Sequence, residues 1–280
     1  MSILILIFVG LFAGILGSIL GLGGGVIVTP ILVLGFNLPI HYSIAAIIIA
    51  VIGTSTGSSI AYLKDDLLNI RLGMFLEIFT TIGALIGAVL TGVFAPNYLN
   101  FFFGALLIYQ AYNMFQKLRG KKPDLLAVKN DKYAEYFHLN SRYFDKLNNK
   151  EVDYYVEKTL LGALIMLGAG FASGLLGIGS GSFKVFAMDS AMKVPLKPSS
   201  ATSNFMMGVT AATSALIYFF NGTVRLEIVV PIVIGIVFGS TLGSRIMPKM
   251  NNKLIRQIFI PVVVLSGIQL VIKAFGVNLY

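Results

Sequence analysis

The stretch Gly21-Leu22-Gly23-Gly24-Gly25 interrupts an apolar N-terminal region, with the hydrophobic residues 3–20 before it and 26–36 after it. Glycine destabilises a helix and leaves backbone N–H and C=O groups uncovered. In a bilayer, uncovered backbone is tolerated only where it packs against protein or lines a polar cavity. The run Gly177-Ile178-Gly179-Ser180-Gly181 repeats this interruption 156 residues later. Interruptions at matching positions of two halves indicate the binding site of a membrane transporter.

The composition indicates a polytopic membrane protein. Of the 280 residues, 56% are hydrophobic and 12% are charged, whereas a typical soluble domain has about 25% charged residues. The apolar residues form blocks, most of them long enough to cross a bilayer. They lie at about 3–20, 24–36, 43–63, 71–94, 98–117, 159–176, 182–192, 199–220, 226–247 and 255–275.

Several other classes of protein are not expected. The chain has no cysteine, so disulfides and thiolate chemistry are excluded, and its two histidines are too far apart to suggest a metal centre. We therefore predict no catalytic residues, no metal and no cofactor. The start of the chain lacks the basic region and cleavage site of a removable signal peptide. The net charge of +9 does not indicate nucleic acid, because the basic residues lie mostly beside apolar segments.

The chain is an internal duplication. Residues 14–117 align with 170–273 at a constant offset of 156 and without a gap. The alignment pairs Gly14 with Gly170 and Thr54 with Thr210, and it pairs prolines and serines as well. Chance matching of apolar residues would not align glycines, prolines and hydroxyl residues so regularly. We divide the chain into a first membrane repeat (1–118), a polar loop (119–158) and a second membrane repeat (159–280).

The distribution of Lys and Arg predicts that the two repeats are inverted. The polar loop holds the densest group of basic residues, so we place it in the cytoplasm. An odd number of crossings per repeat puts eight further basic residues on that side and only Arg225 and Lys273 outside; an even number puts six outside. Both termini are then outside the plasma membrane of a prokaryote. The count leaves open whether 24–36 and 182–192 cross or are re-entrant, and we favour five segments per repeat with half-helices at the glycine runs.

The polar loop has an alternating pattern of apolar and polar residues. Tyr136-Phe137-His138-Leu139 and Val152-Asp153-Tyr154-Tyr155-Val156 flank a pair of asparagines. This pattern favours a small β-hairpin on the cytoplasmic face. The alternative is a simple connector between the repeats.

The glycine runs are the first candidates for substrate binding. A helix that begins anew after a break offers unpaired N–H groups and the positive end of its dipole to an anion. The second run adds serine hydroxyls as donors. The residues assigned to this site are Gly23, Gly24, Gly25, Gly179, Ser180, Gly181 and Ser182. The alternative is that the glycines only allow helices to cross closely.

Lys184 and Glu77 are ionisable residues within apolar sequence. An ammonium at membrane depth is costly and marks a functional site unless the side chain reaches the interface. Lys184 beside a helix N-terminus is unfavourable without an anion, so we predict that it is the counter-charge of the substrate. Glu77 is a candidate proton carrier, with a structural hydrogen bond as the alternative. Asp189 lies five residues after Lys184, about 140° around a helix, so the two should not pair.

Hydroxyl and amide residues complete the candidate site. Such side chains in lipid either bond to their own helix or line a polar cavity. The candidates are Thr54, Ser55, Thr202, Ser203, Asn204 and Thr210. Thr54 and Thr210 are equivalent positions of the two repeats.

Together these motifs resemble the TauE/SafE sulfite exporter family, also called the transmembrane 4-toluenesulfonate uptake protein family. The resemblance rests on Gly17-x3-Gly21-Leu-Gly-Gly-Gly25-x4-Pro30, on Gly174-Leu-Leu-Gly-Ile-Gly-Ser-Gly181 and on Ala201-Thr-Ser-Asn-Phe-Met-Met-Gly208. Asn69-Ile-Arg-Leu-Gly-Met-Phe-Leu-Glu77 adds to it. The resemblance implies transport of sulfite, sulfonates or similar anions, coupled to an ion gradient. Ser180 replaces a usual third glycine, and Ala46-Ile47 stands where the second repeat has Thr202-Ser203, so the two half-sites differ.

The leading hypothesis is therefore an all-α secondary transporter that exports a small inorganic or organosulfur anion by alternating access. Proton coupling and assembly as a homodimer are left open. A passive anion channel or uniporter is the main alternative, since the same residues could line a pore. A membrane-embedded enzyme is a further alternative, although the sequence contains no nucleotide fingerprint and no usable nucleophile–base pair.

Overall fold

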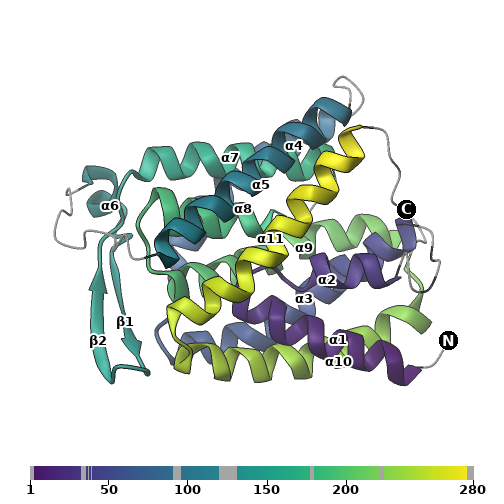
Figure 1. Cartoon of the computed structure of the whole chain (residues 1–280), viewed down its shortest axis with the longest axis horizontal. Helices are drawn as coiled ribbons and strands as arrows, with labels where there is room; N and C mark the ends of the chain where they lie inside the picture. The colour runs from purple at the N-terminus through teal and green to yellow at the C-terminus, as the bar shows by residue number, and fades with distance from the viewer. Residues whose placement is uncertain are drawn as a thin grey trace.

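The protein is a bundle of long helices with a small β-hairpin at one end, as the computed structural model shows (Figure 1). The structure describes residues 3–32, 36, 38, 40–90, 96–119, 131–176, 180–220 and 224–275. The end of the bundle at which the strands lie is called the hairpin end below. Both chain termini lie toward the opposite end (Figure 1).

The helices fall into two sets on either side of the polar loop. The first set is α1 (Ile3–Leu20), α2 (Gly25–Pro30), α3 (Ile40–Lys64), α4 (Ile70–Val89) and α5 (Pro96–Leu118). The loop contributes α6 (Lys132–Tyr136), β1 (Ser141–Asp145) and β2 (Lys150–Tyr154). The second set is α7 (Thr159–Leu176), α8 (Gly181–Phe186) with its π-helical continuation η2 (Ala187–Ala191), α9 (Leu196–Phe220), α10 (Leu226–Ile246), the 3-10 turn η3 (Met247–Lys249) and α11 (Asn252–Ala274).

Five helical stretches in the described part of the chain are long and apolar enough to cross a membrane. They are Ile3–Leu20, Ala45–Lys64, Ile70–Gly87, Leu226–Lys249 and Asn252–Ile272. The prediction of a helical, polytopic membrane protein is thereby confirmed. By contrast, α2 and α8 have six residues each. At 1.5 Å per residue each is only about 9 Å long, too short to cross about 30 Å of hydrocarbon.

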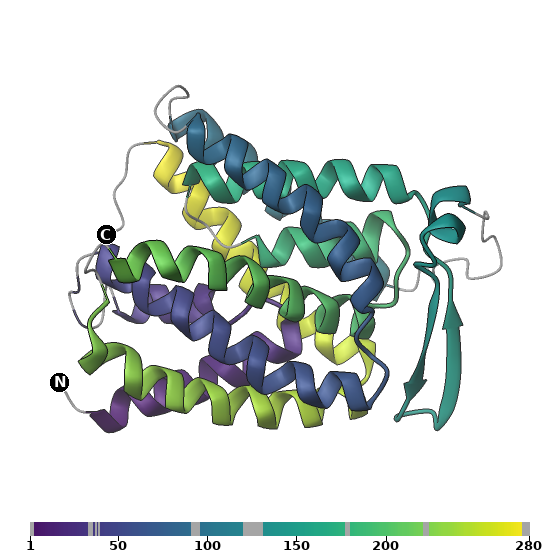
Figure 2. The same ribbon diagram turned by 180° about the vertical axis from the view of Figure 1, so that it is seen from behind.

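The long helices pack in pairs: α1 with α10, α4 with α7, and α5 with α11. Figure 2 shows α3 and α9 side by side between the first two pairs. Glycines permit the close approach: a Cβ on Gly14 would collide with the backbone of Ile236, and one on Gly239 with the backbone of Leu11. Between α4 and α7, a Cβ on Gly170 would meet Thr80 and one on Gly83 would meet Leu167. The contacts in these two helix pairs are equivalent at the offset of 156. The corresponding residues are Gly14 and Gly170, Leu11 and Leu167, Thr80 and Ile236, and Gly83 and Gly239.

In both sets the chain reverses direction between its first long helix and the short helix that follows. Gly24 lies against Ala13 of α1, so α2 folds back along the helix that precedes it. In the second set, the N–H of Glu157, just before α7, donates to the carbonyl oxygen of Met192, just after η2, at 3.0 Å. The chain therefore enters α7 and leaves η2 at the same end of the bundle, the hairpin end.

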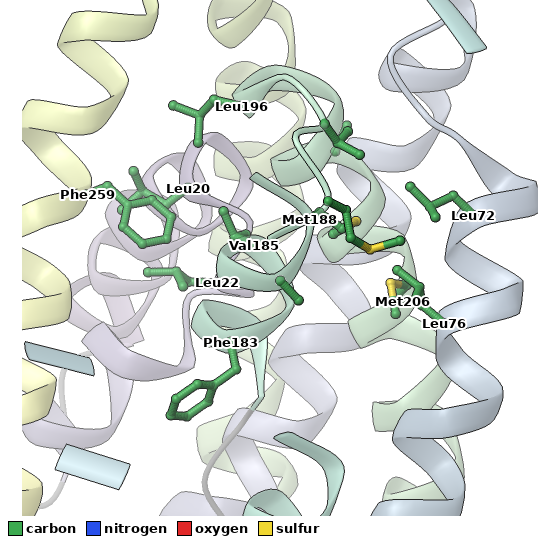
Figure 3. Packing of buried hydrophobic residues seen from close by; sticks show 14 of the residues in the cluster. Leu20, Leu22, Leu72, Leu76, Phe183, Val185, Met188, Leu196, Met206 and Phe259 are labelled. Atoms are coloured by element: carbon green, nitrogen blue, oxygen red, sulfur yellow. The ribbon is translucent and has the colours of Figure 1, made fainter. Parts of the chain in front are cut away.

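Buried apolar side chains from both sets fill the space around α8. Val185 and Phe183 of α8 pack in one cluster with Leu20, Leu76 and Met206 (Figure 3). Each of these residues is at most 7% exposed. Many large apolar side chains on the outer faces remain exposed, as expected for helices that face lipid.

The hairpin is fastened to the ends of several helices. β1 and β2 pair antiparallel, with Tyr143 opposite Val152. Lys197, at the start of α9, donates to Asp145 Oδ1 at 2.9 Å, and Lys146 forms an ion pair of 2.6 Å with Asp65 after α3. The first strand is not where alternation placed it: residues 136–139 follow or end the short helix α6, because the Asp131 side chain accepts from N–H groups in its first turn and caps that helix.

Candidate functional site

The described parts of the two glycine runs, residues 21–25 and 180–181, meet inside the bundle and are called the glycine turns below. Gly21, Gly23 and Gly24 have φ values of 73°, 68° and 76°, a left-handed conformation that glycine adopts without steric cost. The hydroxyl of Ser203 donates to the carbonyl oxygens of Gly21 at 2.8 Å and Gly181 at 3.3 Å. A Cβ on Gly181 would lie 3.1 Å from the carbonyl oxygen of Gly21. Side chains larger than glycine would force the turns apart.

The other predicted residues of the glycine runs surround this contact. Gly24 precedes α2 without a side-chain cap, and Gly25 is the first residue of α2. The carbonyl oxygen of Gly23 accepts from the Thr54 hydroxyl at 3.1 Å, which joins the turn to α3. Ser180 is buried just before α8. Gly179 lies outside the described residues.

Lys184, Glu77 and Thr210 form one buried polar cluster. Lys184 Nζ lies 2.9 Å from Glu77 Oε2 and 2.9 Å from the hydroxyl oxygen of Thr210. The Thr210 hydroxyl also donates to the other Glu77 oxygen, Oε1, or to the carbonyl oxygen of Met206. The exposed fractions of the Lys184 and Glu77 side chains are 0% and 5%. The cluster therefore joins α8, α4 and α9 away from solvent.

The cluster answers two questions that the sequence left open. Lys184 does not reach the surface of the protein, and the charge that balances it is supplied by Glu77 of another helix. The sequence assigns separate roles to the lysine and the carboxylate, and the structure places the two side chains in direct contact. The prediction that Lys184 does not pair with Asp189 agrees with the structure, because Lys184 turns to Glu77.

This charged cluster occurs in only one of two equivalent positions. At the offset of 156, Val28 corresponds to Lys184 and Val233 corresponds to Glu77. Both valines belong to a second apolar cluster around α2. Thr54 corresponds to Thr210, but it donates to the backbone of Gly23 and Ala50. The two aligned halves of the sequence therefore differ at the position where a charge could act.

The remaining predicted residues have different surroundings. The Thr202 hydroxyl accepts from the N–H of Asn69 near the hairpin end. Asn204 donates to the carbonyl oxygen of Ser18 at 2.6 Å, and its buried Oδ1 has no partner among the described residues.

Ser55 lies against Gly208 in a shallow groove of about 510 Å³ between α3 and α9. Ser182 lies in the first turn of α8, and its carbonyl oxygen accepts from Gln110 at 2.9 Å.

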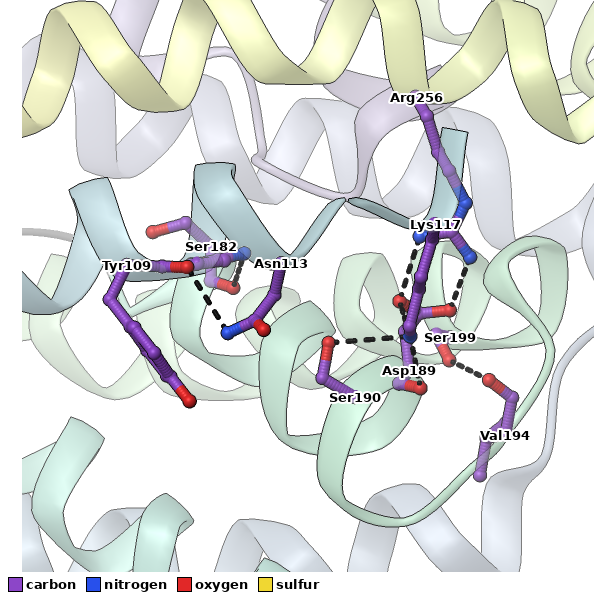
Figure 4. A network of polar contacts seen from close by, with 10 residues as sticks. Tyr109, Asn113, Lys117, Ser182, Asp189, Ser190, Val194, Ser199 and Arg256 are labelled. Atoms are coloured by element: carbon purple, nitrogen blue, oxygen red, sulfur yellow. Dashed lines mark hydrogen bonds and ion pairs between the residues drawn. The ribbon is translucent and has the colours of Figure 1, made fainter. Parts of the chain in front are cut away.

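A second ionic cluster was missed by the sequence analysis. Asp189 is held by Lys117 of α5 and Arg256 of α11 (Figure 4). Lys117 and Arg256 lie near segment ends, and we had interpreted such basic residues only as indicators of membrane orientation. Gln110 was also missed, although an amide in the middle of an apolar segment is a usable signal.

Within the described residues, no group of three His, Asp or Glu side chains is arranged to hold a metal ion. The features that could serve a function are the apolar helices, the glycine turns that meet in the interior, and the lysine–carboxylate pair buried beside them. These features define the class of polytopic membrane transporters.

Comparison with known proteins identifies the family. Residues 6–270 match the family described as sulfite exporter TauE/SafE, so the chain belongs to it. The resemblance found in the motifs is confirmed. The chain is 28% identical over 284 residues to "Probable membrane transporter protein YunE" of Bacillus subtilis (strain 168), which covers 97% of this chain and 98% of that protein. It is 21% identical over 229 residues to "Probable membrane transporter protein YdhB" of the same organism, covering 82% and 84%. No solved structure matches the chain.

Proposed function

We propose that this protein is a secondary transporter of a small sulfur-containing oxyanion, sulfite or an organosulfonate, with Lys184 as the anion's counter-charge. The observation that carries the proposal is the ion pair of Lys184 with Glu77, buried next to the glycine turns. The family description supplies the chemical class of the substrate. A lysine at membrane depth is costly and is retained where an anion or a proton must be handled.

Glu77 acts as an internal placeholder for the substrate. The anion can bind the Lys184 ammonium group only if the ion pair between Lys184 and Glu77 breaks, since the anion and Glu77 compete for the same group. An ionised Glu77 beside a bound oxyanion would leave two buried negative charges around one positive charge. Protonation of Glu77 removes this conflict. Anion and proton therefore bind together, and Thr210, which contacts both side chains, can donate to whichever oxygen carries negative charge.

Alternating access follows from two inverted repeats. The equivalence of the α1–α10 and α4–α7 glycine contacts at the offset of 156 supports such repeats. The return of η2 to the hairpin end supports three full crossings and a re-entrant pair in the second repeat, which is an odd number of crossings. Because the hairpin belongs to the basic polar loop, the hairpin end faces the cytoplasm and the termini face outside.

Flux of radiolabelled sulfite into proteoliposomes tests the proposal, with and without an imposed proton gradient. Accumulation that depends on the gradient is expected. Equilibration without accumulation would indicate a channel or uniporter in place of a coupled transporter. If folded protein transports neither sulfite nor ethanesulfonate, the proposed substrate class is wrong.

The role of Lys184 needs its own variant. Lys184→Ala should abolish flux, and Lys64→Ala is the matched control because Lys64 is an exposed lysine at the end of α3. Normal flux in the Lys184 variant would remove this residue from the transport mechanism.

A further inference from the structure

The cluster around Asp189 contains more positive than negative charge. Arg256 makes a two-pronged contact with the Asp189 carboxylate, at 3.0 Å from Nη1 to Oδ2 and 2.8 Å from Nη2 to Oδ1. Lys117 Nζ adds contacts of 2.8 Å to Oδ2 and 3.0 Å to the Asp189 carbonyl oxygen (Figure 4). Two cations thus share one carboxylate whose side chain is 4% exposed.

The geometry suits an oxyanion. The planar guanidinium of Arg256 binds two oxygens of one group at once, which carboxylate, sulfonate and sulfite all offer. Lys117 can supply a point charge to a third oxygen. The side chains of Lys117 and Arg256 are 19% and 12% exposed, so both border the surface while Asp189 is buried. An anion that arrives at the hairpin end would therefore meet the two cations before it met Asp189.

Asp189 also connects this end to the interior. It lies in the π-helical turn η2, which continues α8 without interruption. Such turns are frequent at functional sites. The same helical segment carries Lys184 five positions earlier, so displacement of Asp189 would move the element that holds Lys184.

We propose that Lys117 and Arg256 form a second oxyanion site at the hairpin end, and that Asp189 occupies and closes this site until the anion displaces it. The inference rests on the proposed transport of a small oxyanion. In the closed state, the Asp189 contacts hold α5, η2 and α11 together. When a sulfonate or sulfite takes Arg256 and Lys117, η2 separates from α5 and α11 and the path toward Lys184 opens.

The natural chain has no cysteine, so one introduced cysteine reports this opening. Met114 is suitable because it is fully buried on α5, three residues before Lys117. Protein carrying Met114→Cys would be placed in lipid nanodiscs, where a hydrophilic maleimide can reach both faces. Ethanesulfonate serves as the probe anion, since it does not react with maleimides. Labelling is expected to be slow without the anion and at least about tenfold faster when Asp189→Asn weakens the closing contacts.

The probe anion should act through the two cations. Ethanesulfonate should accelerate labelling of Met114→Cys protein that retains Asp189, and Arg256→Gln should abolish this response. Asp65→Asn is the matched control, because it breaks the 2.6 Å ion pair with Lys146 at the same end of the bundle. It should leave labelling unchanged.

Three results would overturn the inference. They are unchanged labelling in folded Asp189→Asn protein, equal acceleration by Asp65→Asn, and labelling that ethanesulfonate does not affect. If Asp189→Asn does not fold, Lys117→Gln removes one closing contact and carries the same expectation. Labelling requires no transport, so loss of flux in Lys184→Ala protein with an intact labelling response would separate the two sites. A flux failure therefore tests the proposed function alone.

Discussion

Lys184 and Glu77 are 107 positions apart in the sequence, yet their side chains form an ion pair of 2.9 Å with almost no exposure. The pair joins the short helix α8 to α4, and each residue is the other's charge partner. Any substitution of one therefore changes the state of the other. Stability and transport must be measured together to tell structural effects from functional ones.

Removal of either charge alone should destabilise the protein. Lys184→Met or Glu77→Leu leaves one unpaired charge in the apolar interior, at a cost of about 3–5 kcal/mol. The double variant leaves no charge and should recover most of that loss without recovering transport. Thermal unfolding in detergent, together with sulfite flux, checks both parts. A double variant as unstable as the sum of the single variants would show that the pair is not coupled in this way.

Glu77→Gln should separate anion binding from proton binding. Glutamine is similar in shape to a protonated glutamate and cannot ionise, so it does not compete with an anion for Lys184 as a carboxylate does. Binding of ethanesulfonate, which stays singly charged between about pH 5 and 8, should weaken in the unsubstituted protein as the pH rises, whereas binding to the variant should change little. Gradient-driven accumulation should be lost in the variant while equilibration persists. Binding titrations and flux measurements between about pH 5 and 8 test this prediction. A variant whose pH profile equals that of the unsubstituted protein would exclude Glu77 as the coupling group.

The glycine contacts between helices should be sensitive to a single methyl group. Gly14→Ala and Gly170→Ala each place a Cβ against the backbone of the paired helix, so we expect a loss of about 1–3 kcal/mol for each. Gly168→Ala is the control, since no atom lies within 4 Å of its added Cβ. It should be neutral or stabilising by up to about 1 kcal/mol. Equal apparent melting temperatures for all three variants would contradict the close packing at Gly14 and Gly170.

The attachment of the hairpin should weaken in acid. Burial by itself raises the pKa of Asp145, but the hydrogen bond and charge of Lys197, aided by Asn148, hold that pKa below its usual range. The unfolded chain, with a pKa of about 3.9, therefore takes up the proton first as the pH falls. The stabilisation is complete above this value and is lost as the pH falls through the lower pKa of the folded state.

Asp145→Asn tests this attachment. At neutral pH it should cost about 1.5–3 kcal/mol, because Lys197 is left buried without its carboxylate. The variant should also lose less stability than the unsubstituted protein when the pH is lowered from about 5 to about 3. Asp153→Asn makes the same charge change on the exposed side of β2 and should have little effect on either measurement. Unfolding temperatures across this pH range provide the comparison.

Some structural features were predictable because they depend on local sequence. Blocks of apolar residues predicted the long helices, and the first glycine run predicted where α1 ends. The polar loop was harder, since Tyr136 and its neighbours have a strand-like pattern but the helix that Asp131 caps ends at Tyr136. The contacts of neighbouring hydroxyls in α9 were not predictable either: the Ser203 hydroxyl donates to Gly21, whereas the Thr202 hydroxyl accepts from the N–H of Asn69.

The sequence by itself determined that this is a membrane protein, and it predicted two repeats, two glycine interruptions and ionisable residues in costly positions. Those conclusions follow from composition, spacing and the free energy of burying charge, all of which are local properties. Only the tertiary structure decided that Glu77 is the partner of Lys184 and that Lys117 and Arg256 enclose Asp189. Partner choice depends on how helices distant in sequence pack and rotate against one another, because a buried charge must pair with whichever opposite charge that packing brings within reach.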